Sequence, residues 1–380
     1  MWRLGSLNTV AAFTFYEVTP HHSRLRSQQR QSTSYFKDPS GLDSSWLKST
    51  YPVLTLPPEI ITEIFVAFLP NYPDFPSLRG IFSPLLFCQI CQKWRAIALS
   101  TPILWRAICV DLTRGDSDRK IAADLQQLKT WLKRSGDCPL SLGLTHARKV
   151  THRLVPQFLR AIVAHCQRWE HVDLLIPFEY MDLIRGEMPL LRNLTFGPSN
   201  FPHGRARFPH LFSSAAQLQS VILTRNFFKS IMTLPWKQLT HLEADCLYEQ
   251  ECVDIFREVP LLVAGIFRVC QHPGRSDISL GPAISPHDHL RNLILDADEE
   301  AAIPPRLSML LDCLTLPTLC TLQVAGPCIT LESVAAFITR SQCYLEHLCI
   351  AGTSLSESAY RAALPPFGTF TLEPYSQQLQ

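Results

Sequence analysis

The chain has 380 residues, of which 46% are hydrophobic and 18% are charged, and its formal net charge is +2. This length predicts two or three domains or one repeat array. The nearly balanced charge gives no electrostatic reason to expect nucleic acid or a membrane surface as a partner. Since no run of eighteen apolar residues occurs, no transmembrane helix is expected either.

The first 50 residues lack sustained periodicity, and residues 20–45 are rich in Ser and Gln. This composition predicts a disordered N-terminal arm. Arg24, Arg26 and Arg30 leave a mitochondrial targeting segment open as an alternative. The sequence has thirteen cysteines but no convincing signal peptide, so reduced thiols and a cytoplasmic or nuclear location are expected.

Two helices are predicted after the arm. Pro57 and Pro58 suit a first helical turn, and apolar residues then recur at helical spacing until Pro70. A second helix is predicted from Leu85 to Leu99, and Thr101-Pro102 ends it. Its inward residues are expected to be Leu86, Ile90, Trp94, Ile97 and Ala98.

Three short motifs in this helical segment together resemble an F-box, the module that docks a protein onto the Skp adaptor of a cullin-type ubiquitin ligase. They are Leu56-Pro57-Pro58-Glu59-Ile60, the Cys91 to Trp94 element, and Pro102 to Trp105. The link of residues 71–84 is longer than is usual in the family. The resemblance implies that Leu56 and Pro57 meet the adaptor. It also implies that five further residues shape or support that surface: Ile60, Ile64, Cys91, Trp94 and Trp105.

The remainder of the chain predicts a repeat. A helix through Ile121 and Leu132 should end at Gly136, and residues 139–144 read as a strand. An apolar-x-x-apolar-x-apolar unit then returns every twenty-one to twenty-nine residues or so, which is typical of leucine-rich repeats. The eight copies begin at Trp169, Leu191, Leu218, Leu239, Leu262, Leu290, Leu319 and Leu345, the copy at Leu262 being degraded by Gly265.

Helical stripes fill several of the intervals between these strands, among them Val150 to Cys166, Val253 to Val259 and Leu331 to Ile338. Asn226 and Cys270 occupy the position after a strand where the repeat prefers a ladder residue. The last copies, with Ile338 to Leu345, are similar to those of fungal F-box proteins. The predicted fold is therefore an α/β leucine-rich-repeat solenoid, with parallel strands on the concave face and helices outside, preceded by a small all-α F-box domain.

The predicted organisation has five parts. They are an arm (1–50), an F-box-like domain (51–111), a connecting helix and first strand (112–148), a leucine-rich-repeat domain (149–360) and a C-terminal tail (361–380).

Motifs for reaction chemistry are not found. Cys88 and Cys91 have the spacing of half a zinc site without a second pair, and His287-x-His289 is a loose pair in a loop. Packing is expected for the cysteines and a solvated or capping role for the histidines. No phosphate-binding Gly-rich loop or catalytic signature occurs. We therefore expect no enzyme activity, no cofactor and no metal.

The function that the resemblance implies is substrate recognition in a Skp–cullin–F-box ubiquitin ligase. The F-box would bind the Skp adaptor, and through it the cullin, while the repeats bind an unknown target protein. Two basic groups, His146 to Arg153 and His203 to Arg207, are candidates for contact with an acidic partner or are merely solvated. The alternative is a non-enzymatic repeat scaffold in which the F-box-like helices only cap the solenoid.

Overall fold

A computed structural model describes residues 55–113, 117–146, 153–200, 211–224, 227, 229, 234–270, 284–297 and 305–373. The chain divides into two compact units, Met1–Thr55 and Leu56–Gln380, and all the described helices and strands belong to the second. The predicted arm of residues 1–50 lies outside the described residues, as do Asn226, Val150 and the loop from His203 to Arg207.

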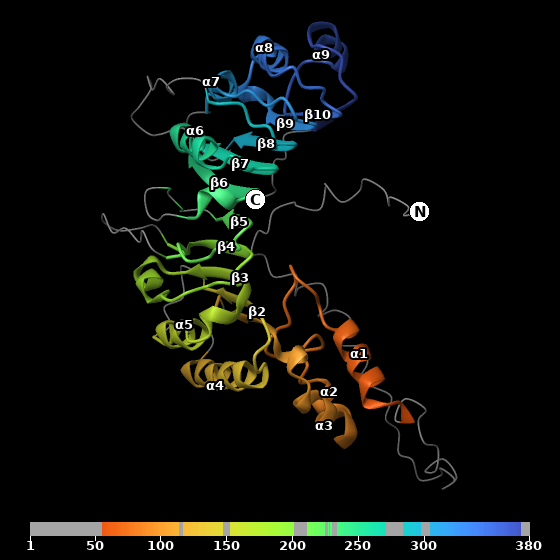
Figure 1. The fold of residues 1–380 in the computed structure, drawn as a ribbon, viewed down its shortest axis with the longest axis vertical. Coiled ribbons are helices and arrows are strands. Elements are labelled where there is room, and N and C mark those ends of the chain that lie inside the picture. Colours follow the sequence, from red (N-terminus) through yellow and green to blue (C-terminus); the bar gives the residue numbers. More distant parts are fainter. Residues whose placement is uncertain are drawn as a thin grey trace. The chain divides into compact units, whose positions relative to one another are not determined.

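The second unit is built on one sheet of eleven parallel strands, which lie side by side in the order in which they occur in the chain (Figure 1). The strands are β1 Ala107–Asp111, β2 Leu140–Thr145, β3 Trp169–Ile176, β4 Asn193–Pro198, β5 Ser220–Leu223, β6 His241–Tyr248, β7 Ala264–Cys270, β8 Asn292–Ala297, β9 Thr321–Ala325, β10 His347–Ala351 and β11 Thr369–Glu373.

The helices occur at the start of the unit and between strands. The α-helices are α1 Pro58–Phe68, α2 Phe87–Ile90, α3 Gln92–Ser100, α4 Asp118–Arg134, α5 Val155–Val163, α6 Glu249–Glu258, α7 Leu307–Cys313, α8 Leu331–Ser341 and α9 Glu357–Ala363. The 3-10 helices are η4 Pro102–Trp105, η5 Cys166–Arg168, η6 Phe178–Leu183, η8 Trp236–Gln238 and η9 Gly326–Cys328.

The register of the sheet explains why the repeat is apolar at two positions. Ile108 of β1 pairs with Leu142, Leu142 with Val172, and the same column continues to Phe370 of β11. A second column lies two residues further along each strand, and from β1 to β10 both columns are buried against the helices in one core. All eight repeat copies coincide with β3 to β10. The prediction of a parallel, α/β solenoid-like arrangement is confirmed.

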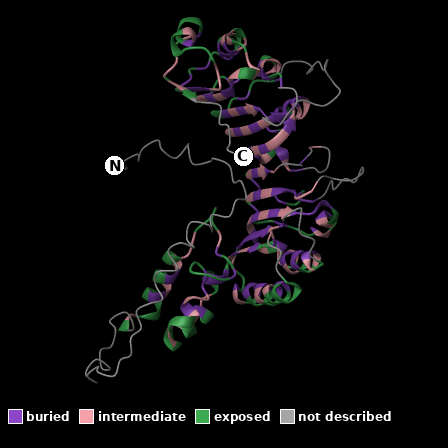
Figure 2. Ribbon diagram, turned by 180° about the vertical axis from the view of Figure 1, so that it is seen from behind, coloured by how far each residue is buried: buried purple, intermediate pink, exposed green. Residues whose placement is uncertain are grey.

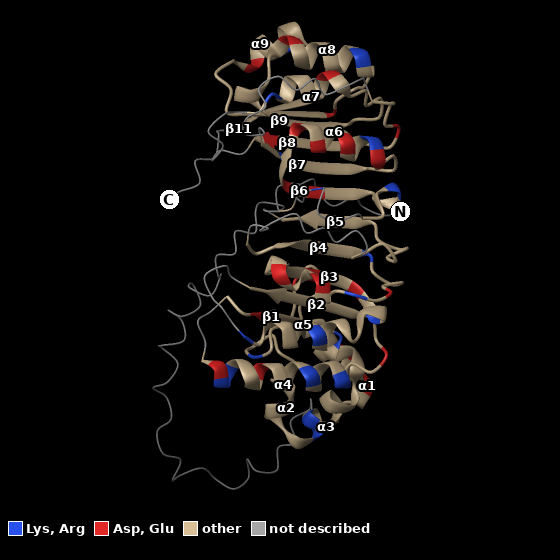
Figure 3. Cartoon of the chain, turned by 90° about the vertical axis from the view of Figure 1, so that its left-hand side faces the viewer, with Lys and Arg blue, Asp and Glu red and all other residues tan. Residues whose placement is uncertain are grey.

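The helices between strands pack successively on the buried face of the sheet, with α4 against α5 and α6 against α7, and α7 against α8 (Figure 3). α4 carries the predicted residues Ile121 and Leu132 inward, and Gly136 follows it with the positive φ of 53° that glycine tolerates best. Strand residues alternate between buried and half-buried (Figure 2). We call the face with the half-buried positions the open face.

The sheet extends past the predicted repeat domain of residues 149–360 at both ends. β1 lies inside the segment assigned to the F-box-like domain, and β11 lies inside the segment assigned to the tail. In both strands apolar residues recur at every second position, Ile108 and Val110 in β1 and Phe370 and Leu372 in β11, although only in β11 are the residues between them polar. Since a strand with one face buried needs this pattern, the signal was present in the sequence.

The predicted helix from Leu85 to Leu99 is wrong as one continuous element. It is broken at Cys91, whose extended backbone ends α2 and whose Sγ accepts a hydrogen bond from the Trp94 backbone amide at 3.4 Å. The side chain thus caps α3, as a serine would. Because of the break, Ile90 is 52% exposed rather than inward, while Ile97 and Ala98 are buried as predicted.

The link of residues 71–84 covers the first edge of the sheet. The backbone amide of Cys109 in β1 donates to the carbonyl of Pro76 at 2.8 Å, and Ser77 forms a parallel bridge with Cys109. Further along, Arg79 pairs with Asp124 of α4 at 2.9 Å. The link therefore has a structural use, since it pairs backbone groups that an edge strand would leave open.

Candidate partner-binding surfaces

Helix α1 presents two apolar rows on different sides. Ile61 and Phe65 are completely buried, and the ring of Phe65 stacks on Phe87 with centroids 4.0 Å apart. Ile60 and Ile64 are 48% and 42% exposed. Residues four apart share one side of a helix, so the apolar stripe is wide enough to fill the core and leave a second row outside.

The exposed row is part of a larger apolar surface. Nine of the fourteen large hydrophobic side chains that are exposed among the described residues lie between Ile60 and Ile103. Phe68 is 44% exposed and lies with its ring centroid 6.2 Å from that of Phe82 in the link, which is 50% exposed. We call Ile60, Ile64, Phe68 and Phe82 the α1 face. A contiguous exposed apolar surface of this kind is typical of a protein-binding site.

The predicted adaptor-binding residues occupy different depths. Pro57 is exposed at the start of α1, and Leu56 before it is half-buried against the core, with its carbonyl accepting a hydrogen bond from Lys93 Nζ at 3.0 Å. Together with Ile60 and Ile64 they lie along or next to one end of α1. These four residues are therefore placed within reach of a single partner.

Cys91 and Trp94 support this surface from behind. Trp94 is half-buried, and its ring lies edge-on to Phe65 with centroids 5.0 Å apart. Cys91 fixes the start of α3 through its bond to the Trp94 amide. Trp94 thus packs α3 against α1, and both Cys91 and Trp94 are less exposed than Ile60.

Trp105 is part of the core and has no exposed surface. Its Nε1 donates to the Ala98 carbonyl at 2.9 Å, and its ring lies edge-on to Trp131 of α4 with centroids 5.0 Å apart. The Arg134 guanidinium lies 4.6 Å from the centre of the Trp105 ring. Trp105 therefore joins the helical segment to α4 and acts on a docking surface only by supporting it.

Phe68 and Phe82 belong to the α1 face but were absent from the predicted site. Phe68 follows Ile60 and Ile64 at the same spacing of four residues, so the sequence could have placed it on the same side of the helix. Phe82 lies in an irregular link whose sequence has no period, and only its ring contact with Phe68 reveals its place.

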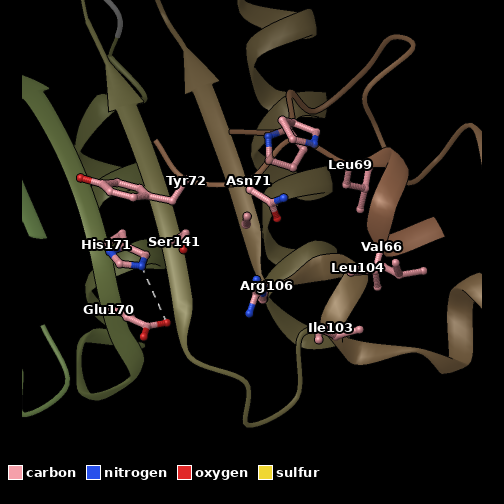
Figure 4. A pocket seen from close by; sticks show the side chains of 13 residues that line it. Val66, Leu69, Asn71, Tyr72, Ile103, Leu104, Arg106, Ser141, Glu170 and His171 are labelled. Atoms are coloured by element: carbon pink, nitrogen blue, oxygen red, sulfur yellow. Dashed lines mark ion pairs between the residues drawn. The ribbon is translucent and has the colours of Figure 1, made fainter. Parts of the chain in front are cut away.

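A pocket of about 230 Å³ lies where α1 and the link meet the first strands (Figure 4). Val66, Leu69 and Leu104 form one wall, and Glu170 and His171 lie on the other. The ring of Tyr72 stacks on that of His171, with centroids 4.1 Å apart. Burial lowers the pKa of His171 despite the Glu170 carboxylate 4.0 Å from its Nε2, so the imidazole is neutral near pH 7. The stack anchors the link to the sheet.

The open face holds several carboxylates near its strand centres. Burial raises the pKa of Asp173 on β3 to about 6, against the opposing effect of a hydrogen bond from Thr195. On β6 and β7, Asp245 pairs with Arg268 at 2.8 Å, and on β6 burial and Asp245 raise the pKa of Glu243. Asp173, Glu243, Asp245 and Arg268 are thus half-buried charged side chains on the face of the sheet that points away from the core.

The remaining candidate residues have structural surroundings. Cys88 and Cys91 are separated by the helix break. His287 is buried and its Nε2 donates to the Phe256 carbonyl at 2.6 Å, which is the capping role, whereas His289 is exposed. Among the described residues, no three His, Cys, Asp or Glu side chains are grouped to hold a metal ion. Nor does any helix in the described ranges have the length and apolarity to cross a membrane.

No family model matches the chain, and the comparison with curated proteins finds no significant match.

Proposed function

We propose that this chain is the substrate-recognition subunit of a Skp–cullin–F-box ubiquitin ligase and that it catalyses no reaction itself. The F-box-like helices bind the Skp adaptor, and the repeat-like strands and helices hold a target protein. Transfer of ubiquitin is then promoted by proximity, because a tethered target is present at high effective concentration.

The observation that carries the proposal is the exposed row of α1. Ile60 and Ile64 stay largely in contact with solvent although the core next to them is filled by Ile61 and Phe65. Burying two such side chains in a partner is worth roughly 2–4 kcal/mol at about 25 cal/mol per Å². That free energy corresponds to about one to three decades in affinity.

The test is a binding assay between the full chain and a purified Skp adaptor. Ile60→Ala with Ile64→Ala should weaken binding by at least about tenfold, while alanine maintains the helix. Leu190→Ala with Leu261→Ala is the matched control, because these leucines are 37% and 44% exposed away from α1. A folded α1 variant that binds the adaptor like the wild type would refute the proposal, and Leu56→Ala with Pro57→Ala would probe the other end of the same surface.

A second candidate is a repeat scaffold whose helical segment only caps the solenoid. It is favoured by the link, since Pro76 and Ser77 cover the edge of β1 and Gln127 of α4 donates to the Leu78 carbonyl at 2.6 Å. The same binding assay separates the candidates. A scaffold predicts no adaptor binding by the wild-type chain, and it leaves the exposed row of α1 without a function.

A further inference from the structure

The centre of the open face has a row of side chains that combines apolar contact with a negative charge. Ile222 of β5 pairs with Glu243 of β6, Glu243 pairs with Ile266 of β7, and Ile266 pairs with Ile294 of β8. All four side chains are half-buried. Neighbouring strands lie about 4.8 Å apart, so Glu243 has an isoleucine within one strand spacing on each side. Outward isoleucines are unexpected on a face that only meets water.

A second row two residues further along is charged. Arg268 of β7 lies in register between Asp245 of β6 and Asp296 of β8, and it donates to Asp245 at 2.8 Å. Counting Glu243 with these three gives three carboxylates and one guanidinium, a formal charge of −2. Burial and Asp245 raise the pKa of Glu243 while Arg268 lowers it, so the net surroundings disfavour the Glu243 charge. A further cation beside Glu243 would stabilise its ionised carboxylate.

The two rows together fit one kind of side chain. Arginine and lysine have an aliphatic stem that packs on apolar surface and a cationic head that binds carboxylate. With the stem over Ile222 or Ile266 and the head at Glu243, both parts of such a side chain find matching groups. An acidic segment would instead meet the excess of carboxylates, which disfavours it.

We propose that the centre of the open face, from β5 to β8, is the target-binding site of this chain and takes an extended protein segment in which an arginine or lysine lies next to an apolar residue. The inference rests on the proposed function as a substrate receptor and names the chemistry of the substrate. This occupant is argued from charge complementarity with Glu243, from the formal charge of −2 around it, and from the isoleucines on either side of it.

The test begins with selection from a random heptapeptide phage library on the full wild-type chain, and in parallel on Glu243→Gln and Glu187→Gln. Glu187 is exposed and lies outside the strands, so it controls for loss of one negative charge. The wild type and Glu187→Gln should enrich peptides with arginine or lysine beside an aliphatic residue, and Glu243→Gln should not. Failure to enrich basic peptides, or the same enrichment with Glu243→Gln, would overturn the inference.

The enriched peptide is then synthesised with its basic residue as arginine and as citrulline, which has the same shape but no charge. Binding to the full chain should fall by about tenfold or more with citrulline, or with Glu243→Gln, because a charge-assisted contact is lost. Equal affinities would refute the site. The adaptor assay is run beside it on the wild type and on Glu243→Gln, and the two should bind the adaptor equally. Adaptor binding by the wild type, together with equal affinities for the two peptides, would show that this inference alone has failed.

Discussion

Replacing Gly265 by a larger residue should destabilise the protein, even though Gly265 lies in a buried apolar column. It lies in register between Leu242 and Leu293, where every other described strand has a larger side chain. A Cβ atom at Gly265 would lie 2.8 Å from Cε2 of Phe267 and 3.3 Å from Cδ2 of Leu262. The completely buried ring of Phe267 therefore occupies the space that the missing side chain leaves.

This geometry predicts a strong coupling between the two positions. Gly265→Ala should cost about 1–3 kcal/mol because it overpacks a filled core. Phe267→Leu should cost roughly 2 kcal/mol for the lost carbon atoms, including those that contact Phe256 at a centroid distance of 5.3 Å. Leucine has no atom equivalent to Cε2, so Gly265→Ala should be nearly neutral in the Phe267→Leu background. The coupling energy is then about 1–3 kcal/mol.

The assay is urea unfolding of the wild type, both single variants and the double variant, followed by far-ultraviolet circular dichroism. Hydrogen exchange of the β6, β7 and β8 amides locates the change. If the two single effects add in the double variant, the space at Gly265 is not taken by Phe267, and the reasoning is wrong.

Two further predictions concern the helical segment and the open face. Trp105→Phe should speed hydrogen exchange in α3 and η4 and cost about 1–3 kcal/mol, because it leaves the Ala98 carbonyl without its donor at 2.9 Å; unchanged exchange would contradict this. The pKa of Asp173 is about 6 in the folded chain against an ordinary value of 3.8, so the folded state holds this proton more tightly and its stability falls as pH rises between these values. The difference in urea-unfolding midpoint between Asp173→Asn and the wild type should therefore shift in favour of the variant as pH rises from 4 to 6, and it should stay constant above pH 6. A midpoint difference that does not change with pH would contradict this prediction.

Strands β3 to β10 were predictable because each repeat copy sets two inward positions, nearly all of them apolar, in fixed register. Leu293 and Leu295 of β8, for example, stand where the repeat pattern requires them. The break at Cys91 was not predictable, because no proline or glycine marks it. The break depends on the Cys91 sulfur accepting a hydrogen bond from the Trp94 amide, and helix propensities contain no information on such a contact.

The candidate docking surface was predictable in part. The apolar period of α1 identified Ile60, Ile61, Ile64 and Phe65 equally, and nothing in a period distinguishes residues that face the core from those that face a partner. Burial separates them into Ile61 and Phe65 inside and Ile60 and Ile64 outside. The central row of the open face was also missed. It joins residues of four strands far apart in the sequence, such as Ile222 and Ile294, that only the register brings together.

The order of the strands has a consequence for how the chain is made. Each strand from β2 to β10 pairs with the one synthesised just before it and the one synthesised just after it, and the edge strands β1 and β11 each pair with their single neighbour. A strand leaving the ribosome thus meets a partner that is already present, and the loop closed by each pairing is short. The sheet can grow in step with translation, one strand at a time, and each new unit buries the apolar surface left exposed by its predecessor.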